Sequence, residues 1–265
     1  MSYLSSIHIA TNRTHPFPYD IPAIKYAKNI DVSNPITFLV GENGSGKSTL
    51  LETLACRLQL PHMDGADYNK PSFDAAKRLL PYLELTWTID RPTGFFFRAE
   101  DFGDYLNSVN RTDAQIQNKF SDLEGKVPDH IISQMKENAN YQLRYMRKNY
   151  GQELDAFSHG EAYLHIMEQM IKSPGIYLLD EPEAALSPSK QLSFIYFLHN
   201  HLQNHLSQFI IATHSPMLMA YPGATIYEIT NEAMQATPLE NTDHYSVTKS
   251  FLNDPNAFLR HFNAE

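Results

Sequence analysis

The glycine-rich segment at residues 41–48 constrains this chain more than any other part of its sequence. Its letters, GENGSGKS, fit the pattern G-x-x-x-x-G-K-[ST] at every fixed position. In this pattern backbone N–H groups surround phosphate oxygens, the lysine reaches the β- and γ-phosphates, and the final hydroxyl ligates magnesium. The segment therefore predicts a phosphate loop that binds a nucleotide. The expected contacts are Gly41, Glu42, Asn43, Gly44, Ser45, Gly46, Lys47, Ser48 and Thr49.

The segments on either side of the phosphate loop support this prediction. Residues 36–40, with the letters ITFLV, form a β-branched and aromatic run that is typical of a buried strand. After the loop, Leu50, Leu54 and Leu58 recur at helical spacing. A helix that begins near Lys47 directs its positive end at the phosphates.

Length and composition favour one α/β domain. The chain has 265 residues, of which 42% are hydrophobic, and this is enough for a full core with a smaller insertion. No apolar run approaches the roughly 20 residues that cross a bilayer, and the polar start of the chain does not resemble a signal peptide. We therefore expect a soluble, cytoplasmic protein without direct membrane insertion. The net charge of −9 argues against coating of nucleic acid through bulk charge, although a local basic patch stays compatible with it.

The order of the strand and helix patterns predicts a P-loop NTPase fold with a mainly parallel sheet flanked by helices. Residues 101–156 are mostly polar and predict an inserted helical subdomain within a single domain that spans residues 1–265. A last helix is expected from His244 to Phe262, with an interruption near Pro255. The expected strands are 3–10, 36–40, 83–89, 94–98, 176–179, 209–212 and 224–229.

A second apolar strand, at residues 176–179, ends in two acidic residues, Asp180 and Glu181. An acid in this position beside a phosphate loop usually holds magnesium, directly or through water, so Asp180 joins Ser48 as an expected metal ligand. Glu181 is placed to orient or deprotonate the attacking water if its carboxylate points at the γ-phosphate. The two acids therefore predict nucleotide hydrolysis.

Three further motifs resemble those of ABC-type ATPases, and they occur in the expected order. The run DEPEAALSP at residues 180–188 is similar to the Walker B motif and D-loop, and FSHGE at residues 157–161 resembles the LSGGQ signature. THSP at residues 213–216 resembles the H-loop with its switch histidine, His214. The resemblance implies an ATPase that uses ATP and Mg²⁺, with Lys47, Glu181 and His214 in catalysis.

The signature-like segment implies that ATP also joins two subunits. Ser158, Gly160 and Glu161 stand at the expected start of a helix, where the Ser158 hydroxyl and the Gly160 amide can donate hydrogen bonds to a γ-phosphate. In the family, this helix end meets the nucleotide that a second subunit holds. The resemblance therefore implies an ATP-dependent, head-to-tail homodimer that closes around two ATP molecules.

The run EAALSP after the acidic pair is similar to a branch of small stand-alone ATPases related to DNA-repair, SMC and overcoming-lysogenization-defect proteins. Transporter D-loops usually end in aspartate, where this chain has Ser187. This branch implies action on nucleic acid, a nuclease or another effector protein in repair or defence. The alternative is the ATP-binding subunit of a membrane transporter. A nucleotide sensor without turnover is disfavoured because Glu181 and His214 are both present.

Two positions of the family pattern have no obvious occupant. The strand at residues 94–98 runs into Glu100 where the family has the Q-loop glutamine, so Glu100 is the expected substitute near the metal. For adenine stacking, Tyr19 lies at the transporter-type distance before the phosphate loop, and Arg13 is the alternative if the repair-type arrangement applies.

Other features have simple structural interpretations. Ser187 and Pro188 are typical of the N-cap and first residue of a helix. His201 and His205 have i, i+4 spacing, but without an intervening glutamate they indicate a polar helix face and not a zinc site. The single cysteine, Cys56, is expected to be a buried thiol.

Overall fold

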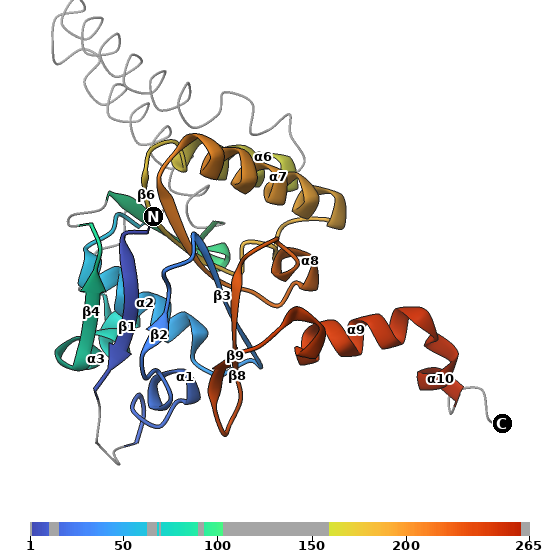
Figure 1. The fold of residues 1–265 in the computed structure, drawn as a ribbon, viewed down its shortest axis with the longest axis horizontal. Coiled ribbons are helices and arrows are strands. Elements are labelled where there is room, and N and C mark those ends of the chain that lie inside the picture. Colours follow the sequence, from blue (N-terminus) through green and yellow to red (C-terminus); the bar gives the residue numbers. More distant parts are fainter. Residues whose placement is uncertain are drawn as a thin grey trace, which may run out of the picture.

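The computed structural model describes residues 2–10, 16–62, 68, 70–89, 93–102 and 159–260, with the backbone alone at 159–162. Two sheets and the helices packed on them make up this part of the chain (Figure 1). The strands are β1 (Leu4–Ile9), β2 (Ile30–Asp31), β3 (Ile36–Gly41), β4 (Leu83–Trp87), β5 (Gly94–Arg98), β6 (Gly175–Asp180), β7 (Ser207–Ala212), β8 (Thr225–Ile229) and β9 (Met234–Ala236). The α-helices are α1 (Pro22–Lys25), α2 (Lys47–Leu58), α3 (Asp74–Leu79), α6 (His159–Met170), α7 (Pro188–Asn204), α8 (Pro216–Met219), α9 (Asp243–Asn253) and α10 (Pro255–Leu259).

The central sheet has six strands in the order β5-β6-β7-β3-β8-β9. Its neighbouring strands are parallel except for β8 and β9, so the predicted, mainly parallel sheet is confirmed. Because β3, β6 and β7 run in the same direction, their carboxyl ends lie at one edge of the sheet. This edge brings together the phosphate loop after β3, the acidic pair at the end of β6 and the THSP segment after β7.

A second sheet, which the sequence patterns did not predict, contains β2, β1 and β4 in antiparallel order. The buried Gln208 on β7 joins the two sheets. Its side-chain oxygen accepts hydrogen bonds from the backbone N–H groups of Tyr3 and Leu4, and its amide nitrogen donates to the carbonyl of Leu4. A buried amide is tolerated here because its hydrogen-bonding groups find backbone partners.

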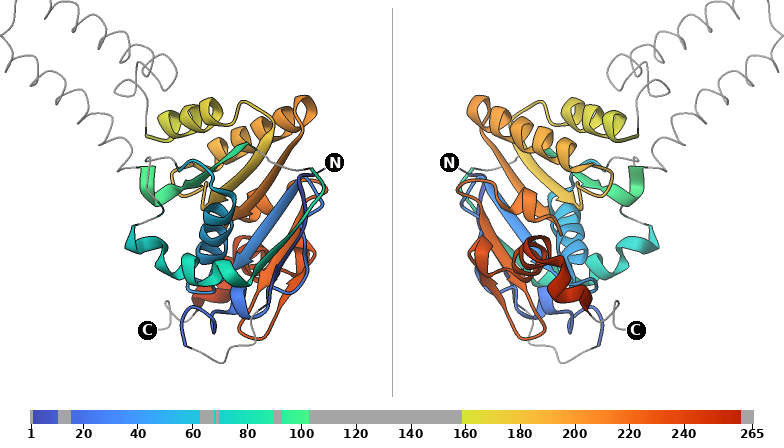
Figure 2. Two further views of the ribbon diagram at one scale, coloured as in Figure 1. Left: turned by 90° about the vertical axis from the view of Figure 1, so that its left-hand side faces the viewer. Right: turned by 90° about the vertical axis from the view of Figure 1, so that its right-hand side faces the viewer.

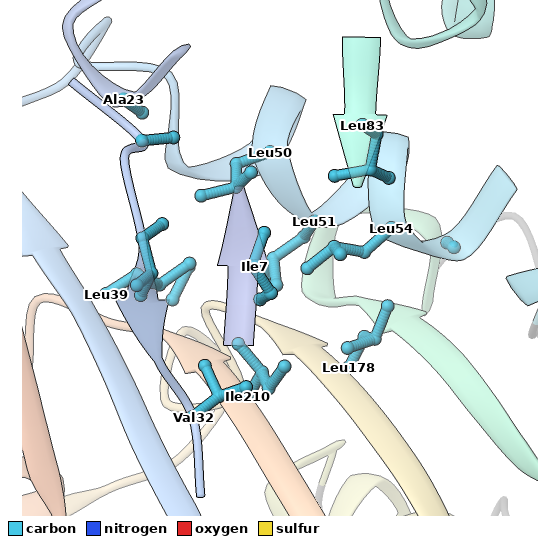
Figure 3. Close-up of a cluster of buried hydrophobic side chains, with 14 of the residues drawn as sticks. Ile7, Ala23, Val32, Leu39, Leu50, Leu51, Leu54, Leu83, Leu178 and Ile210 are labelled. Atoms are coloured by element: carbon cyan, nitrogen blue, oxygen red, sulfur yellow. The ribbon is translucent and has the colours of Figure 1, made fainter. Parts of the chain in front are cut away.

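Helix α2 lies between the two sheets, whereas α6 and α7 cover the other face of the central sheet (Figures 1 and 2). Side chains of β3 point alternately to the two faces of the central sheet. Leu39 packs in the core on the α2 side, while Phe38 and Val40 pack in the core on the other face. Each fully buried aliphatic side chain contributes about 1.5–3 kcal/mol to folding. Figure 3 shows the core around α2. Its labelled members are Ile7, Ala23, Val32, Leu39, Leu50, Leu51, Leu54, Leu83, Leu178 and Ile210.

The helices largely follow their predicted ranges. Helix α2 begins at Lys47, and a proline-marked break at Asp254 separates α9 from α10. Tyr163, Ile166 and Met167 of α6 are fully buried. The predicted insertion at residues 101–156 falls almost wholly on residues 103–158, which lie outside the described residues. None of the described helices is long and apolar enough to cross a membrane.

One helix prediction is confirmed and another is wrong. Ser187 takes the N-cap position of α7 and Pro188 is its first residue, as predicted, although the Ser187 side chain makes no cap hydrogen bond and its hydroxyl lies 3.1 Å from that of Ser189. The α7 histidines do not share a polar face, since His201 is 6% exposed and lies 2.8 Å from the Ser207 hydroxyl. The described residues contain no cluster of three metal-ligating side chains, and Cys56 is buried as expected.

Candidate active site

The phosphate loop holds its lysine inward. Gly46, the N-cap residue of α2, has φ 95°, and this left-handed turn starts the helix at Lys47. Lys47 is 5% exposed, and its Nζ donates hydrogen bonds to the carbonyls of Gly41 and Glu42 at 2.7 and 3.1 Å. Burial lowers the pKa of Lys47, although the nearby Glu181 and Asp180 carboxylates oppose this shift. A cation that is held by carbonyls and faced by acids suits the binding of phosphate oxygens.

A pocket of about 280 Å³ opens over the start of α2. The side chain of Phe17 borders this pocket and is 59% exposed, which is unusual for so large an apolar group. Because aromatic faces stack well on nucleobases, the pocket combines a phosphate cradle with a base platform. The described residues that line it are Phe17, Ile21, Asn43, Gly44, Gly46, Lys47, Ser48, Thr49 and Glu181.

An oxygen-rich pocket lies on the other side of Ser48. It has a volume of about 310 Å³ and is lined by Ser48, Glu100, Asp180 and Glu181 among others. Burial raises the pKa of Asp180 to about 7, against a hydrogen bond from the Ser48 hydroxyl that favours the charged form. Asp180 Oδ1 is buried and has no hydrogen-bond partner among the described residues. Hydroxyl and carboxylate oxygens are the donors that Mg²⁺ prefers, so these residues fit the expected ion.

Glu181 occupies a strained backbone position between this acidic pocket and the THSP segment. Its φ is 50°, a left-handed value that non-glycine residues rarely adopt and that costs of order 1–3 kcal/mol. A hydrogen bond from its N–H to the carbonyl of Ala212 holds the turn. The carboxylate is 46% exposed, and its Oε1 lies 3.5 Å from Nε2 of His214. The turn therefore brings the expected general base and the switch histidine together.

His214 has a second histidine as its neighbour. Its Nδ1 lies 2.9 Å from Nε2 of His244, a residue in the first turn of α9. Burial and the charge of Lys47 lower the pKa of His214, which favours the neutral ring. His244 also lines a third pocket, of about 380 Å³, together with Glu42, Asn43 and Gly44 on the outer side of the phosphate loop.

A buried charged network lies behind the oxygen-rich pocket. The Arg98 guanidinium pairs with both oxygens of Asp101 at 2.6 and 2.9 Å and with Oε1 of Glu52 at 2.7 Å. Its NH1 also lies 3.2 Å from the 71% exposed carboxylate of Glu100. Burial raises the pKa of Glu52 despite this pairing. Arg98 thus anchors the segment that carries Glu100 toward Ser48 and Asp180.

Of the remaining predicted residues, one does not line the pocket over α2, two are described by their backbone alone and two lie outside the described residues. Tyr19 does not line the pocket over α2, because its ring packs edge-on against Tyr82 at 5.7 Å. Gly160 and Glu161 lie in the first turn of α6, whereas Arg13 and Ser158 lie outside the described residues.

Sequence reasoning assigned no role to Phe17, Glu183 or His244. A phenylalanine near Tyr19 gives no local signal that it reaches the phosphate loop. Glu183 was read only as part of the D-loop, yet its Oε1 accepts the N–H of His214. Only the folded chain brings His244, thirty residues further on, against His214.

Comparison with known proteins supports the ATPase reading. The family model described as "ABC transporter" matches residues 32–184. The chain is 29% identical over 192 residues to the nisin transport ATP-binding protein NisT of Lactococcus lactis subsp. lactis, a match that covers 69% of this chain but only 30% of NisT. It is 26% identical over 214 residues to the probable ABC transporter ATP-binding protein p29 of Mesomycoplasma hyorhinis, covering 77% of this chain and 80% of p29.

Solved structures give a weaker likeness. An inward-facing, putative metal-chelate type ABC transporter matches with a TM-score of 0.49 at 17% identity, covering 94% of this chain and 88% of that chain. An Smc head domain from Pyrococcus furiosus matches with a TM-score of 0.48 at 12% identity, covering 96% and 99%. Neither likeness bears on the predicted branch or on its alternative.

Proposed function

The chain belongs to the ABC transporter family of ATPases, and we propose that it hydrolyses ATP as one half of a head-to-tail homodimer. The observation that carries this proposal is the placement of Glu181, which shares a pocket with Lys47 and Ser48 and lies 3.5 Å from His214. A phosphate cradle, a candidate base and a candidate switch histidine therefore meet at one edge of the sheet.

Each group at this edge has a distinct role in the proposed reaction. Lys47 exchanges its carbonyl partners for β- and γ-phosphate oxygens and neutralises their charge. Ser48 and Asp180 would hold Mg²⁺ in the pocket that Glu100 also lines, where the ion would supply positive charge against the phosphates. Glu181 orients the attacking water and accepts its proton, while His214 donates a hydrogen bond from Nε2 to the γ-phosphate.

The adenine ring is proposed to stack on Phe17. Phe17 borders the pocket over α2 with its ring exposed, whereas Tyr19 is packed against Tyr82. We expect Phe17→Ala to raise KM for ATP about tenfold with little change in kcat, since stacking on an aromatic ring contributes about 1–3 kcal/mol per base. Tyr19→Phe is the matched control and should leave KM unchanged. Equal effects of the two substitutions would contradict the assignment to Phe17.

The second subunit is proposed to supply Ser158, Gly160 and Glu161. Among the α6 residues whose side chains are described, 163–170, none lines either pocket at Ser48. The first turn of α6 has backbone N–H groups without intrahelical partners, and these suit a γ-phosphate that another copy presents.

The dimer is tested with Glu181→Gln, which should bind ATP and Mg²⁺ but hydrolyse slowly. Light scattering should give the mass of one chain without nucleotide and of two chains with ATP and Mg²⁺. Adding Lys47→Ala should abolish this dimer, and the exposed Glu84→Gln should behave as wild type. An ATP-bound protein that stays monomeric would rule out the sandwich, and turnover that survives Lys47→Ala would rule out the catalytic assignment.

The closed dimer is proposed to act on nucleic acid or on an effector protein in repair or defence. Support comes from Ser187 in place of the transporter aspartate and from a carboxylate, Glu100, at the Q-loop position. The names of NisT and p29 favour the alternative, the ATP-binding subunit of a membrane transporter. Fluorescence anisotropy of ATP-locked Glu181→Gln with labelled DNA and RNA tests the first reading. Stoichiometric co-purification with one integral membrane protein would support the second.

A further inference from the structure

We propose that His244 is a positioning residue that holds His214 in the tautomer with its proton on Nε2. This inference rests on the proposed role of His214 at the γ-phosphate and deepens it. Nothing in the family motifs of this sequence assigns a role to His244, which lies in the first turn of the helix that follows β9 and not in any of those segments.

Three side chains form a continuous line from the candidate base to α9. Glu181 Oε1 lies 3.5 Å from His214 Nε2, and His214 Nδ1 lies 2.9 Å from His244 Nε2. The shorter distance is that of a hydrogen bond, so exactly one of these two nitrogens carries the shared proton when both rings are neutral. His244 Nδ1 ends the line, buried and without a hydrogen-bond partner among the described residues.

The two possible directions of this hydrogen bond differ in cost. If His214 donates from Nδ1, its bare Nε2 lone pair faces the Glu181 carboxylate, and His244 must keep a buried N–H at Nδ1 with no acceptor. An unpaired buried donor costs about 1–3 kcal/mol. If His244 donates from Nε2, the bare nitrogen is the Nδ1 of His244, and the buried Nε2–H of His214 faces the Glu181 carboxylate at 3.5 Å without a hydrogen bond to it. Each direction therefore leaves one buried N–H without a hydrogen bond, and the attraction between the Nε2–H and the carboxylate favours donation by His244, which places the proton of His214 on Nε2.

The first turn of α9 is fixed where this contact requires it. Thr242, just before the helix, is fully buried and donates from Oγ1 to the carbonyl of Leu239 at 2.8 Å. The N–H of Asp243 donates to Oε1 of Glu228 on β8 at 2.9 Å. His244 therefore enters the site from a turn anchored to the central sheet, although no residue of α9 itself is buried.

A metal ion shared by the two rings explains the contact between His214 and His244 less well than a hydrogen bond does. The 2.9 Å separation fits a direct hydrogen bond, and the described residues contain no group of three side chains that could complete a coordination sphere. With its proton fixed on Nε2, His214 can instead donate a hydrogen bond to an anionic phosphate oxygen, as its proposed role requires.

Steady-state ATPase assays and imidazole NMR on the full chain test the proposal. We expect His244→Ala to lower kcat about tenfold with KM for ATP and the melting temperature unchanged, because a wrong tautomer removes the donor without removing the ring. His244→Gln carries an amide N–H at a similar reach and should recover kcat to within about threefold of wild type. Two-bond ¹⁵N–¹H spectra should show the His214 proton on Nε2 in the wild-type protein, with the signals assigned by their loss in His214→Gln.

Further variants separate this proposal from the role of His214 itself. His199→Ala removes an exposed histidine of α7 and should change nothing. Combining His244→Ala with His214→Ala should cost no more than His214→Ala alone. Full activity in His244→Ala, or a wild-type His214 proton on Nδ1, would overturn the positioning role. Full activity in His214→Ala would instead overturn the proposed role of His214.

Discussion

The backbone N–H of His214 donates a 2.7 Å hydrogen bond to Oε1 of Glu183. Glu183 follows β6 and His214 follows β7, so this bond ties the loops at the ends of two neighbouring strands. Burial raises the pKa of Glu183, which means that its carboxylate is held inside the protein at some cost. The arrangement of the site thus depends on a residue that does not itself need to contact nucleotide.

We expect Glu183→Ala to lower the free energy of unfolding by about 1–3 kcal/mol, because it leaves the N–H of His214 without its acceptor. Glu183→Gln keeps an oxygen at Oε1 and removes a buried charge, so it should retain most of the stability. Denaturant unfolding measures both values. An alanine variant that unfolds at the wild-type denaturant concentration would show that the bond contributes nothing.

The phosphate loop should tolerate a methyl group at one glycine and not at another. A Cβ at Gly46 would lie 2.2 Å from Cγ2 of Ile21, and the φ of 95° is unfavourable as well. A Cβ at Gly44 meets nothing within 4 Å, so Gly44→Ala should cost only about 1 kcal/mol for its left-handed φ of 82°. Thermal unfolding without nucleotide should show the larger loss for Gly46→Ala. Equal losses would mean that α1 moves aside freely.

Removing Arg98 should be severe, because it takes the guanidinium away from the buried carboxylate of Glu52 and leaves Asp101 with His62, 3.2 Å away, as its remaining side-chain partner. The Arg98 side chain is 13% exposed and the two acids are 10% and 11% exposed. Breaking one partner of such a network costs about 3–5 kcal/mol, so Arg98→Met should lower the free energy of unfolding by that amount. Lys77→Ala breaks an exposed 3.3 Å pair with Asp74 and serves as the control, expected within about 0.5 kcal/mol of wild type.

Stability should fall in mild acid because of His201. Burial lowers the pKa of this histidine from 6.5 to about 4, so between these values the unfolded chain binds a proton that the folded chain does not. The contribution is fully present above pH 6.5 and is lost as the pH falls toward 4, with a slope of at most about 1.4 kcal/mol per pH unit. His201→Gln can still bond Ser207 but does not titrate. Its unfolding free energy should therefore depend less on pH than that of wild type, and identical pH profiles would refute the assignment.

Local patterns were enough to predict seven of the nine described strands, α2 and the phosphate loop, but not the short β2 and β9. Each depends on a short run, such as residues 36–40, whose composition and periodicity determine its structure almost alone. The small sheet was missed because β1 and β4 pair across some seventy residues of sequence. Nothing within Leu4–Ile9 indicates which strand it pairs with.

The residues of the candidate site also divide into those that a local motif predicts and those that it does not. Lys47, Ser48, Asp180 and Glu181 are readable because fixed spacing within a motif puts them at strand ends. His244 and Phe17 join the site only through tertiary contacts, which no spacing rule encodes. An exposed phenylalanine or a histidine in a first helical turn is ordinary until its neighbours are known.

Strand β3, which carries the phosphate loop, has both of its neighbours late in the chain, at residues 207–212 and 225–229. During translation, therefore, residues 36–41 leave the ribosome long before either partner strand has been made. By contrast, β1 and β4 can pair once residue 87 is complete. Until β7 and β8 have been made, the apolar β3 has two unpaired edges, a state prone to aggregation and open to chaperones. The strand order thus makes the segment that will bind ATP the last of the early strands to find its place.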